Sequence, residues 1–106
     1  MPESDATPSQ PILSDYRHDT DLAELVELFV SEMPERLETL LAAFDQGDLE
    51  RVRVESHRLR GAGSGYGFPI LTEAAAKVED GIRDEFDATN LQAAFDDLVS
   101  LCQRVK

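Results

Sequence analysis

Residues 56–68 read Ser-His-Arg-Leu-Arg-Gly-Ala-Gly-Ser-Gly-Tyr-Gly-Phe, and this stretch decides how the chain is expected to fold. Most of this stretch forms the C-terminal half of a helix predicted over residues 49–66. In a helix, successive positions are turned by about 100° around the axis. Five positions gather on one side and define the face toward the core: Leu49, Val52, Ser56, Leu59 and Gly63. His57 lies about 130–140° from the centre of that face. Its imidazole is therefore predicted to point outward.

The outward face around His57 is basic and uncrowded. Arg53 and Arg60 flank the histidine at helical spacing, and Gly61 follows it by one turn. Val54 and Ser64 complete the face. Four of the ten basic residues lie within ten positions, in a chain of net charge −12: Arg51, Arg53, Arg58 and Arg60. Because histidine can act as a nucleophile near neutral pH, a local positive field around it suits a phosphoryl group.

Working outward, apolar residues at three- and four-residue steps predict three further helices. The first spans about residues 21–44, with a kink at Pro34, and ends in the turn 45–48, where Asp48 caps the next helix. Another begins at Pro69 and runs to about residue 85, and the last follows a turn over residues 86–89. We expect an all-α fold, an antiparallel up-down-up-down four-helix bundle over residues 20–106. Residues 1–19, rich in proline and polar residues, are expected to form a flexible N-terminal segment.

Each helix has its own set of expected core residues. The first contributes Leu22, Leu25, Val26, Phe29, Met33, Leu37, Leu40, Leu41 and Phe44. The third contributes Ile70 or Leu71, with Ala74, Ala75, Val78 and Ile82. The last contributes Leu91, Ala94, Phe95, Leu98, Leu101 and Cys102. Ile12, Leu13 and Tyr16 are candidates for attaching the N-terminal segment to the bundle.

Composition narrows the class of function. The acidic net charge argues against nucleic acid as a partner. No apolar run is long enough to span a bilayer, and no signal-peptide core is present, so we expect a cytoplasmic protein without a membrane partner. With one cysteine, Cys102, and two distant histidines, His18 and His57, no metal-ligand spacing exists and no metal site is expected.

The alternating glycines at 61, 63, 65 and 67 superficially suggest a nucleotide-binding loop. The dinucleotide pattern fails, because its last position falls on Tyr66 or Phe68, and no Gly-Lys-Ser/Thr follows for a P-loop. Gly63 is expected instead to allow close helix packing, and Gly61 to leave the outer side open.

His57-Arg58-Leu59-Arg60-Gly61, followed by Gly67, Leu71, Ala74 and Glu79, resembles the signature of histidine-containing phosphotransfer (HPt) domains. The stretch from Phe29 to Pro34 and the Gly47-Asp48 turn are also similar to that family, and the resemblance covers about residues 20–104. It implies a phosphocarrier of a two-component phosphorelay, without kinase machinery of its own. His57 would accept a phosphoryl group, from an aspartyl phosphate of a receiver domain or from a histidine kinase, and pass it to the aspartate of a response regulator.

The resemblance also implies roles for the other residues of the motif. The attacking atom of His57 would be Nε2, Arg60 would replace the family's lysine and neutralise phosphoryl oxygens, and Gly61 would make room for the partner. Gly67 would serve the turn into the next helix. Arg53, Arg58, Val54 and Ser64 are candidates for neutralising the phosphoryl group or for binding the partner, and Ser64 could equally be structural. No cofactor of its own is expected, Mg²⁺ would belong to the receiver partner, and the protein would be a monomer.

Two alternatives stay open at this point. One is an HPt-like helical docking module that performs no phosphoryl transfer. The other is a di-metal carboxylate bundle, which needs Glu-x-x-His pairs on two helices. Residues 54–57 read Val-Glu-Ser-His, which is not that pattern, and no helical histidine is predicted elsewhere.

Overall fold

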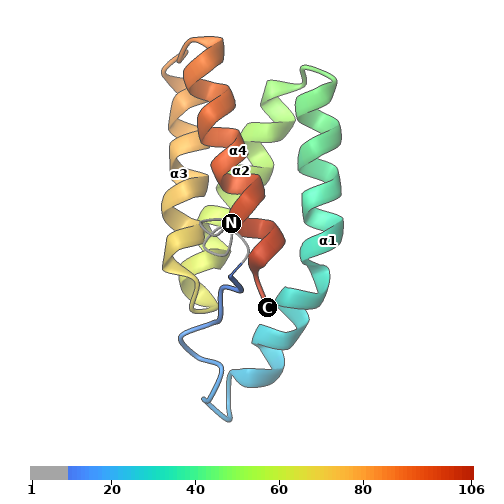
Figure 1. Ribbon diagram of the computed structural model, residues 1–106, viewed down its shortest axis with the longest axis vertical. Coiled ribbons are helices and arrows are strands. Elements are labelled where there is room, and N and C mark those ends of the chain that lie inside the picture. Colours follow the sequence, from blue (N-terminus) through green and yellow to red (C-terminus); the bar gives the residue numbers. More distant parts are fainter. Residues whose placement is uncertain (1–9) are drawn as a thin grey trace, which may run out of the picture.

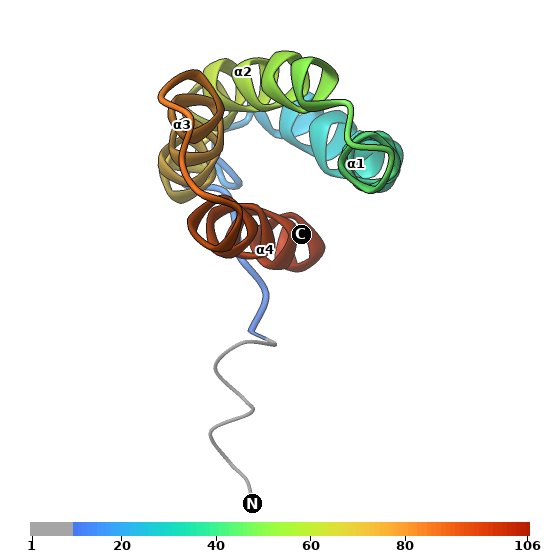
Figure 2. The ribbon, with the colours of Figure 1, turned by 90° about the horizontal axis from the view of Figure 1, so that it is seen from above.

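The computed structural model describes residues 10–106 as four helices in one bundle (Figure 1). They are α1 (Ala23–Asp45), α2 (Leu49–Gly65), α3 (Pro69–Arg83) and α4 (Ala88–Arg104). Seen from above, they follow one another around a ring, and α4 returns to contact α1 (Figure 2). Short turns make successive helices antiparallel. The predicted all-α, up-down-up-down bundle is therefore confirmed.

Local sequence explains where the helices begin. The Asp48 carboxylate accepts a hydrogen bond from the Arg51 N–H (3.1 Å) and caps α2, as predicted. The Asp87 carboxylate caps α4 in the same way through the Asn90 N–H (2.8 Å). This cap starts α4 inside the region predicted as a turn. Elsewhere the helix ends differ from the predicted ones by two residues or fewer.

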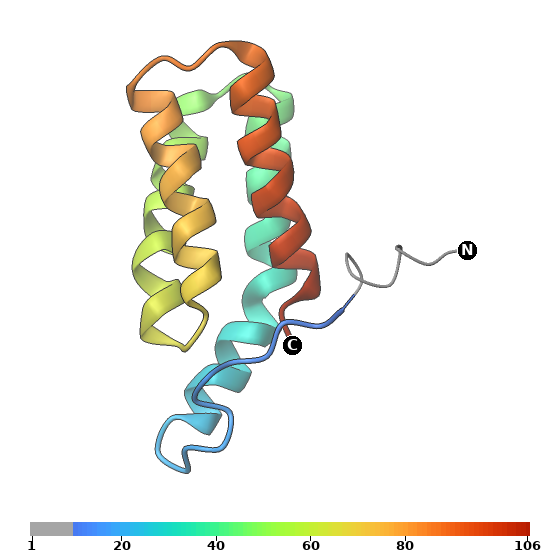
Figure 3. The ribbon, with the colours of Figure 1, turned by 60° about the vertical axis from the view of Figure 1, so that its left-hand side comes forward.

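Pro34 lies within α1 without ending it. Its side of the helix is exposed, so the lost backbone hydrogen bond falls toward solvent. The N-terminal part of α1 leans away and extends past the ends of its neighbours (Figure 3).

The core follows the predicted stripes, with a few corrections. Most of the expected residues are buried, among them Phe29, Leu40 and Leu98. Leu25 and Leu41 are exposed by 47% and 42%, so the prediction that they join the core is wrong. Leu25 lies on the protruding start of α1, and Leu41 lines an open groove between α1 and α4. At the start of α2, Leu49 is 39% exposed. In α3 the buried member of the predicted pair is Leu71, and Ile70 is exposed.

Cys102 is buried, as predicted, and burial raises the pKa of its thiol to about 12. Among the residues described, no helix has the length and apolar composition needed to cross a membrane.

The segment before α1 is attached to the bundle at two places. Ile12 pairs with Val105 in a short parallel bridge, closed by backbone hydrogen bonds to Arg104 and Lys106. The buried Ser14 hydroxyl donates to the Tyr66 C=O (2.6 Å), and the Asp15 N–H donates to the Gly67 C=O (2.9 Å). Leu13 is exposed by 48% and Tyr16 by 38%. Of the segment predicted to be flexible, residues 12–15 are thus held by hydrogen bonds, and residues 1–9 lie outside the described part.

Candidate functional site

The imidazole of His57 lies on the surface of α2, where its side chain is 69% exposed. Its Nδ1 is 2.9 Å from Oε2 of Glu79, on the neighbouring helix α3. One ring nitrogen is therefore directed at the carboxylate, and Nε2, on the opposite side of the ring, faces away from it. Within residues 10–106 no hydrogen bond to Nε2 is formed. The outward direction predicted from helix register is correct.

The charge state of Glu79 determines which nitrogen carries the proton. The carboxylate is only 13% exposed, and burial alone would raise its pKa. Hydrogen bonds from Arg60 (Nη1 to Oε1, 3.2 Å) and from His57 outweigh burial and hold the pKa of Glu79 below its ordinary value. An ionised carboxylate only accepts hydrogen bonds, so the neutral imidazole must carry its proton on Nδ1. The lone pair is then on Nε2, the nitrogen that is open to an incoming group.

The arginines around His57 are paired with carboxylates. Arg53 binds Glu50 through two hydrogen bonds (2.6 and 3.0 Å), which raise the pKa of its guanidinium. Arg58 binds Glu55 (3.1 Å), a residue that also pairs with Arg51. The predicted positive field is therefore largely cancelled within the protein, and Arg58 is directed toward Glu55.

Arg60 is the arginine that shares a partner with His57. Besides Glu79 it lies 3.6 Å from Oδ1 of Asp80, which in turn pairs with Arg83. It is 44% exposed, and both of its ion pairs are on the side of α3 next to the imidazole. Of the four arginines, Arg60 is the one that binds the same carboxylate as His57.

The glycines of the motif have three different environments. A Cβ built on Gly61 would meet nothing within 4 Å, so the surface beside His57 is open there. A Cβ on Gly63 would lie 2.6 Å from Thr72 Oγ1 and 2.9 Å from the Thr72 backbone nitrogen. Gly67 has a φ of +84°, which glycine adopts without strain, and its missing side chain makes room for Ser14.

Ser64 points to α3. Its hydroxyl donates to Thr72 Oγ1 (3.0 Å), and its backbone N–H donates to the same oxygen (2.8 Å). The sequence left open whether Ser64 binds the imidazole or serves the structure, and its bonds join it to Thr72. Val54 is half-buried on the outward face of α2, as its register predicts.

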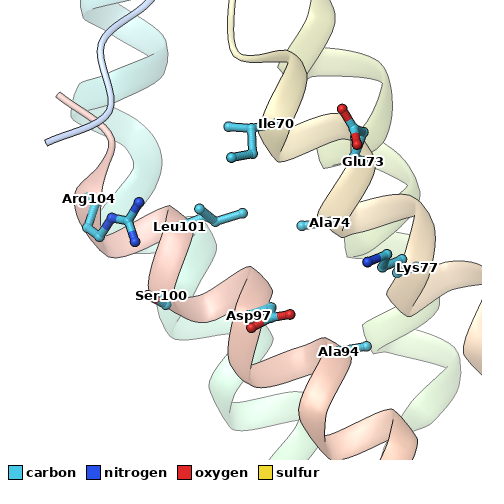
Figure 4. Close-up of a pocket in the computed structure, with 9 residues that line it drawn as sticks. All are labelled: Ile70, Glu73, Ala74, Lys77, Ala94, Asp97, Ser100, Leu101 and Arg104. Carbon is cyan, nitrogen blue, oxygen red and sulfur yellow. The ribbon is translucent and has the colours of Figure 1, made fainter. Parts of the chain in front are cut away.

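A groove between α3 and α4 lies on the opposite side of α3 from Glu79. Lys77 and Asp97 lie along it, with Ile70 and Arg104 toward one end (Figure 4). His57 does not line this groove. The imidazole is instead exposed on the surface of α2.

Sequence reasoning missed the roles of two residues of α3. Glu79 belonged to the quoted motif but had no role, and Thr72 was not singled out. Both lie on one face of α3, seven residues apart, and both contact α2. That spacing was visible in the sequence, but the register between the two helices was not.

Among residues 10–106, no group of three or more His, Cys, Asp or Glu side chains is placed to hold a metal ion. A family model described as Hpt domain matches residues 24–106, which is most of the chain. Searches of curated proteins and of solved structures found no match.

Proposed function

This chain belongs to the Hpt domain family, and on that premise we propose that it is a phosphocarrier that accepts a phosphoryl group on His57 and passes it to a receiver-domain aspartate. The observation that carries the proposal is the hydrogen bond between His57 Nδ1 and Glu79 (2.9 Å). It fixes the proton on the inner nitrogen and leaves the lone pair of Nε2 facing solvent. A nucleophile oriented by a neighbouring carboxylate is the arrangement that covalent catalysis requires.

The proposed step balances without a further reactant. The Nε2 lone pair attacks the phosphorus of an aspartyl phosphate, a P–N bond forms, and the P–O bond to the aspartate breaks. The aspartate leaves as a carboxylate, and the imidazole becomes a cationic phosphohistidine that keeps its Nδ1 proton. Glu79 stabilises that positive charge through the hydrogen bond it already accepts. The return step, to a second aspartate, is the reverse.

Arg60 is the side chain that we propose to neutralise the phosphoryl oxygens. Its guanidinium and the imidazole bind the same carboxylate, Glu79, and its side chain is 44% exposed. Arginine offers several donors in a fork that matches phosphoryl geometry. We place Arg53 and Arg58 in supporting positions, because they pair with Glu50 and Glu55 and not with Glu79, the carboxylate that binds His57. Mg²⁺ and its acidic ligands would be supplied by the receiver partner.

The partner would dock on the outward face of α2 and the adjoining part of α1. Gly61 and Gly65 are open there, so a second protein could approach the helix backbone closely. Leu25 and Leu28 are exposed by 47% and 54% on the protruding start of α1. A small apolar patch with a charged rim is typical of a transient interface.

Transfer of label from receiver domains tests the proposal. A panel of receiver domains carrying ³²P on their aspartates is incubated with the wild-type protein, with His57→Gln and with His18→Gln. We expect wild type and His18→Gln to take up label that is labile in acid and stable in alkali, and His57→Gln to take up none. Label on His57→Gln at the wild-type level would overturn the proposal. Binding of a receiver without any label on wild type would favour the docking module instead.

A further inference from the structure

The hydroxyl of Thr72 forms hydrogen bonds with two backbone groups of α2, about one turn after His57. In a regular helix the Ser64 N–H would donate to the Arg60 C=O, four residues earlier. Here the Ser64 N–H donates to Thr72 Oγ1 (2.8 Å), and Thr72 Oγ1 donates to the Arg60 C=O (2.8 Å). A side chain from α3 thus links the two backbone groups.

The hydroxyl is fully used by these contacts. It donates its one proton to Arg60 and accepts from both the N–H and the hydroxyl of Ser64. Gly63 makes the approach possible, because a Cβ at that position would lie 2.6 Å from Thr72 Oγ1. The contact therefore locks α2 to α3 in one register, and neither helix can slide without breaking it.

The hydrogen bonds of Thr72 lie close to the contact between His57 and Glu79. Arg60 takes part in both contacts: its backbone carbonyl accepts from Thr72, and its side chain donates to Glu79. Glu79 lies two turns after Thr72 on α3. The hydrogen bond between His57 and Glu79 also joins α2 to α3, across 22 positions of sequence. Its length of 2.9 Å is sensitive to any shift of one helix along the other.

We propose that Thr72 is a positioning residue for phosphoryl transfer: by bridging Ser64 and Arg60 it holds α2 in the register at which His57 meets Glu79. This inference rests on the proposed function for its kinetic consequence. Its structural consequence, the tautomer of His57, can be measured without any phosphoryl donor.

The experiment compares Thr72→Val, which removes the hydroxyl at nearly constant volume, with Thr72→Ser, which keeps it. The matched control is Ser64→Ala, which removes one of the three hydrogen bonds but leaves the bridge from N–H to C=O. Two quantities are measured: the rate of label uptake from a phosphorylated receiver domain, and the ¹⁵N NMR pattern that reports which imidazole nitrogen is protonated. Melting temperatures are recorded for every variant.

We expect Thr72→Val to lose the dominance of the Nδ1–H tautomer and to slow label uptake by about tenfold to hundredfold, as displacements near 1 Å do. Thr72→Ser should restore both quantities, and Ser64→Ala should stay within about threefold of wild type. Wild-type behaviour of Thr72→Val would overturn the proposal, as would failure of Thr72→Ser to rescue it or a loss in Ser64→Ala as large as in Thr72→Val.

The test remains decisive if Thr72→Val does not fold or if wild type takes up no label. If Thr72→Val does not fold, Thr72→Ala takes its place, because it removes the hydroxyl without putting a methyl group against Gly63. If wild type takes up no label from any receiver, the proposed function fails, and the tautomer pattern alone still decides whether Thr72 positions His57.

Discussion

At the scale of single residues, the imidazole of His57 can attack only through the ring nitrogen that carries no proton. Glu79 selects that nitrogen, because its carboxylate accepts the Nδ1 hydrogen bond and is itself kept ionised by Arg60. The arrangement separates two tasks between two residues. In the proposed transfer, His57 would provide the nucleophile, and Glu79 would orient it and stabilise the charge that develops on it.

Substitution of Glu79 should separate orientation from charge. Glu79→Gln keeps an oxygen that can accept from Nδ1 but loses the negative charge, and Glu79→Ala loses both. We expect the rate of label uptake to fall in the order wild type, Glu79→Gln, Glu79→Ala, with a loss of at least about tenfold in the alanine variant. Rates are measured with a phosphorylated receiver domain at constant pH. An alanine variant as fast as wild type would contradict the role of Glu79.

Glu79 should also make stability depend on pH. Its pKa is lower in the folded protein than the ordinary value of 4.5. It therefore contributes stability above pH 4.5, and that contribution is lost as the pH falls through the lowered pKa of the folded state. Urea unfolding of wild type and Glu79→Gln between pH 3 and pH 7 checks this. The difference in unfolding free energy should shrink toward acid, and a difference that grows toward acid would contradict it.

The sequence predicted the outward direction of His57 but not its contact with Glu79. The direction of His57 follows from positions on its own helix, such as Leu59 and Gly63, and needs no knowledge of its neighbours. The contact with Glu79 depends on how far α3 is displaced along α2. That displacement is set by Gly63 and Thr72, whose contact is not encoded in any single helical pattern.

At the scale of helices, α2 and α3 form the closest approach in the site. Gly63 is buried against Thr72, and the missing side chain brings the two backbones together. Gly65 lies in the same helix but faces open space. The two glycines are thus equivalent in sequence pattern and opposite in environment, which makes them a matched pair.

Alanine should have opposite effects at the two positions. Gly63→Ala places a Cβ 2.9 Å from the Thr72 backbone nitrogen, and we expect the free energy of unfolding to fall by about 1–3 kcal/mol. Gly65→Ala meets no neighbour and should be neutral or stabilising, by up to about 1 kcal/mol. Chemical denaturation of both variants measures this. Equal effects at the two positions would show that the close approach does not govern the packing of α2 on α3.

Helix boundaries were predicted well where a cap or a proline marks them. Asp48 and Pro69 begin α2 and α3 where expected, because each acts through its own backbone neighbourhood. The start of α4 was placed too late because the capping role of Asp87 was not recognised. Leu25 and Leu41 were assigned to the core by helical spacing, but burial also requires a neighbouring helix, and none covers them.

At the scale of the whole molecule, the segment before α1 contacts two distant parts of the bundle, the residues after α4 and the turn between α2 and α3. Ile12 pairs with the residues that follow α4, and Ser14 fills the space left by Gly67 at the α2–α3 turn. The matched family region begins at residue 24, so this segment precedes it, whereas its partners in the bundle lie within it. Gly67 thus has two roles: it adopts the positive φ that the turn requires, and its missing side chain leaves space for Ser14.

Removal of the Ser14 hydroxyl should destabilise the whole bundle. The hydroxyl is buried and bonds the Tyr66 C=O (2.6 Å) and the Tyr16 N–H (2.9 Å), which lose that partner in Ser14→Ala. We expect the free energy of unfolding to fall by about 1–3 kcal/mol. Ser31→Ala is the control, because the Ser31 hydroxyl is exposed and bonds only its own helix, at Leu28 C=O. A Ser14→Ala protein as stable as Ser31→Ala would show that the Ser14 hydroxyl does not stabilise the fold.

The site of phosphorylation tests the central claim most directly. The ¹⁵N-histidine-labelled protein is treated with phosphoramidate, a small phosphoryl donor that needs no partner, and the modified nitrogen is identified by ¹⁵N–³¹P NMR. His18, which is exposed, serves as an internal reference for ordinary histidine reactivity. The structure predicts a phosphoryl group on Nε2 of His57, with His18 modified far less and no signal from His57→Gln. Modification at Nδ1 of His57, or equal modification of His18 and His57, would contradict it.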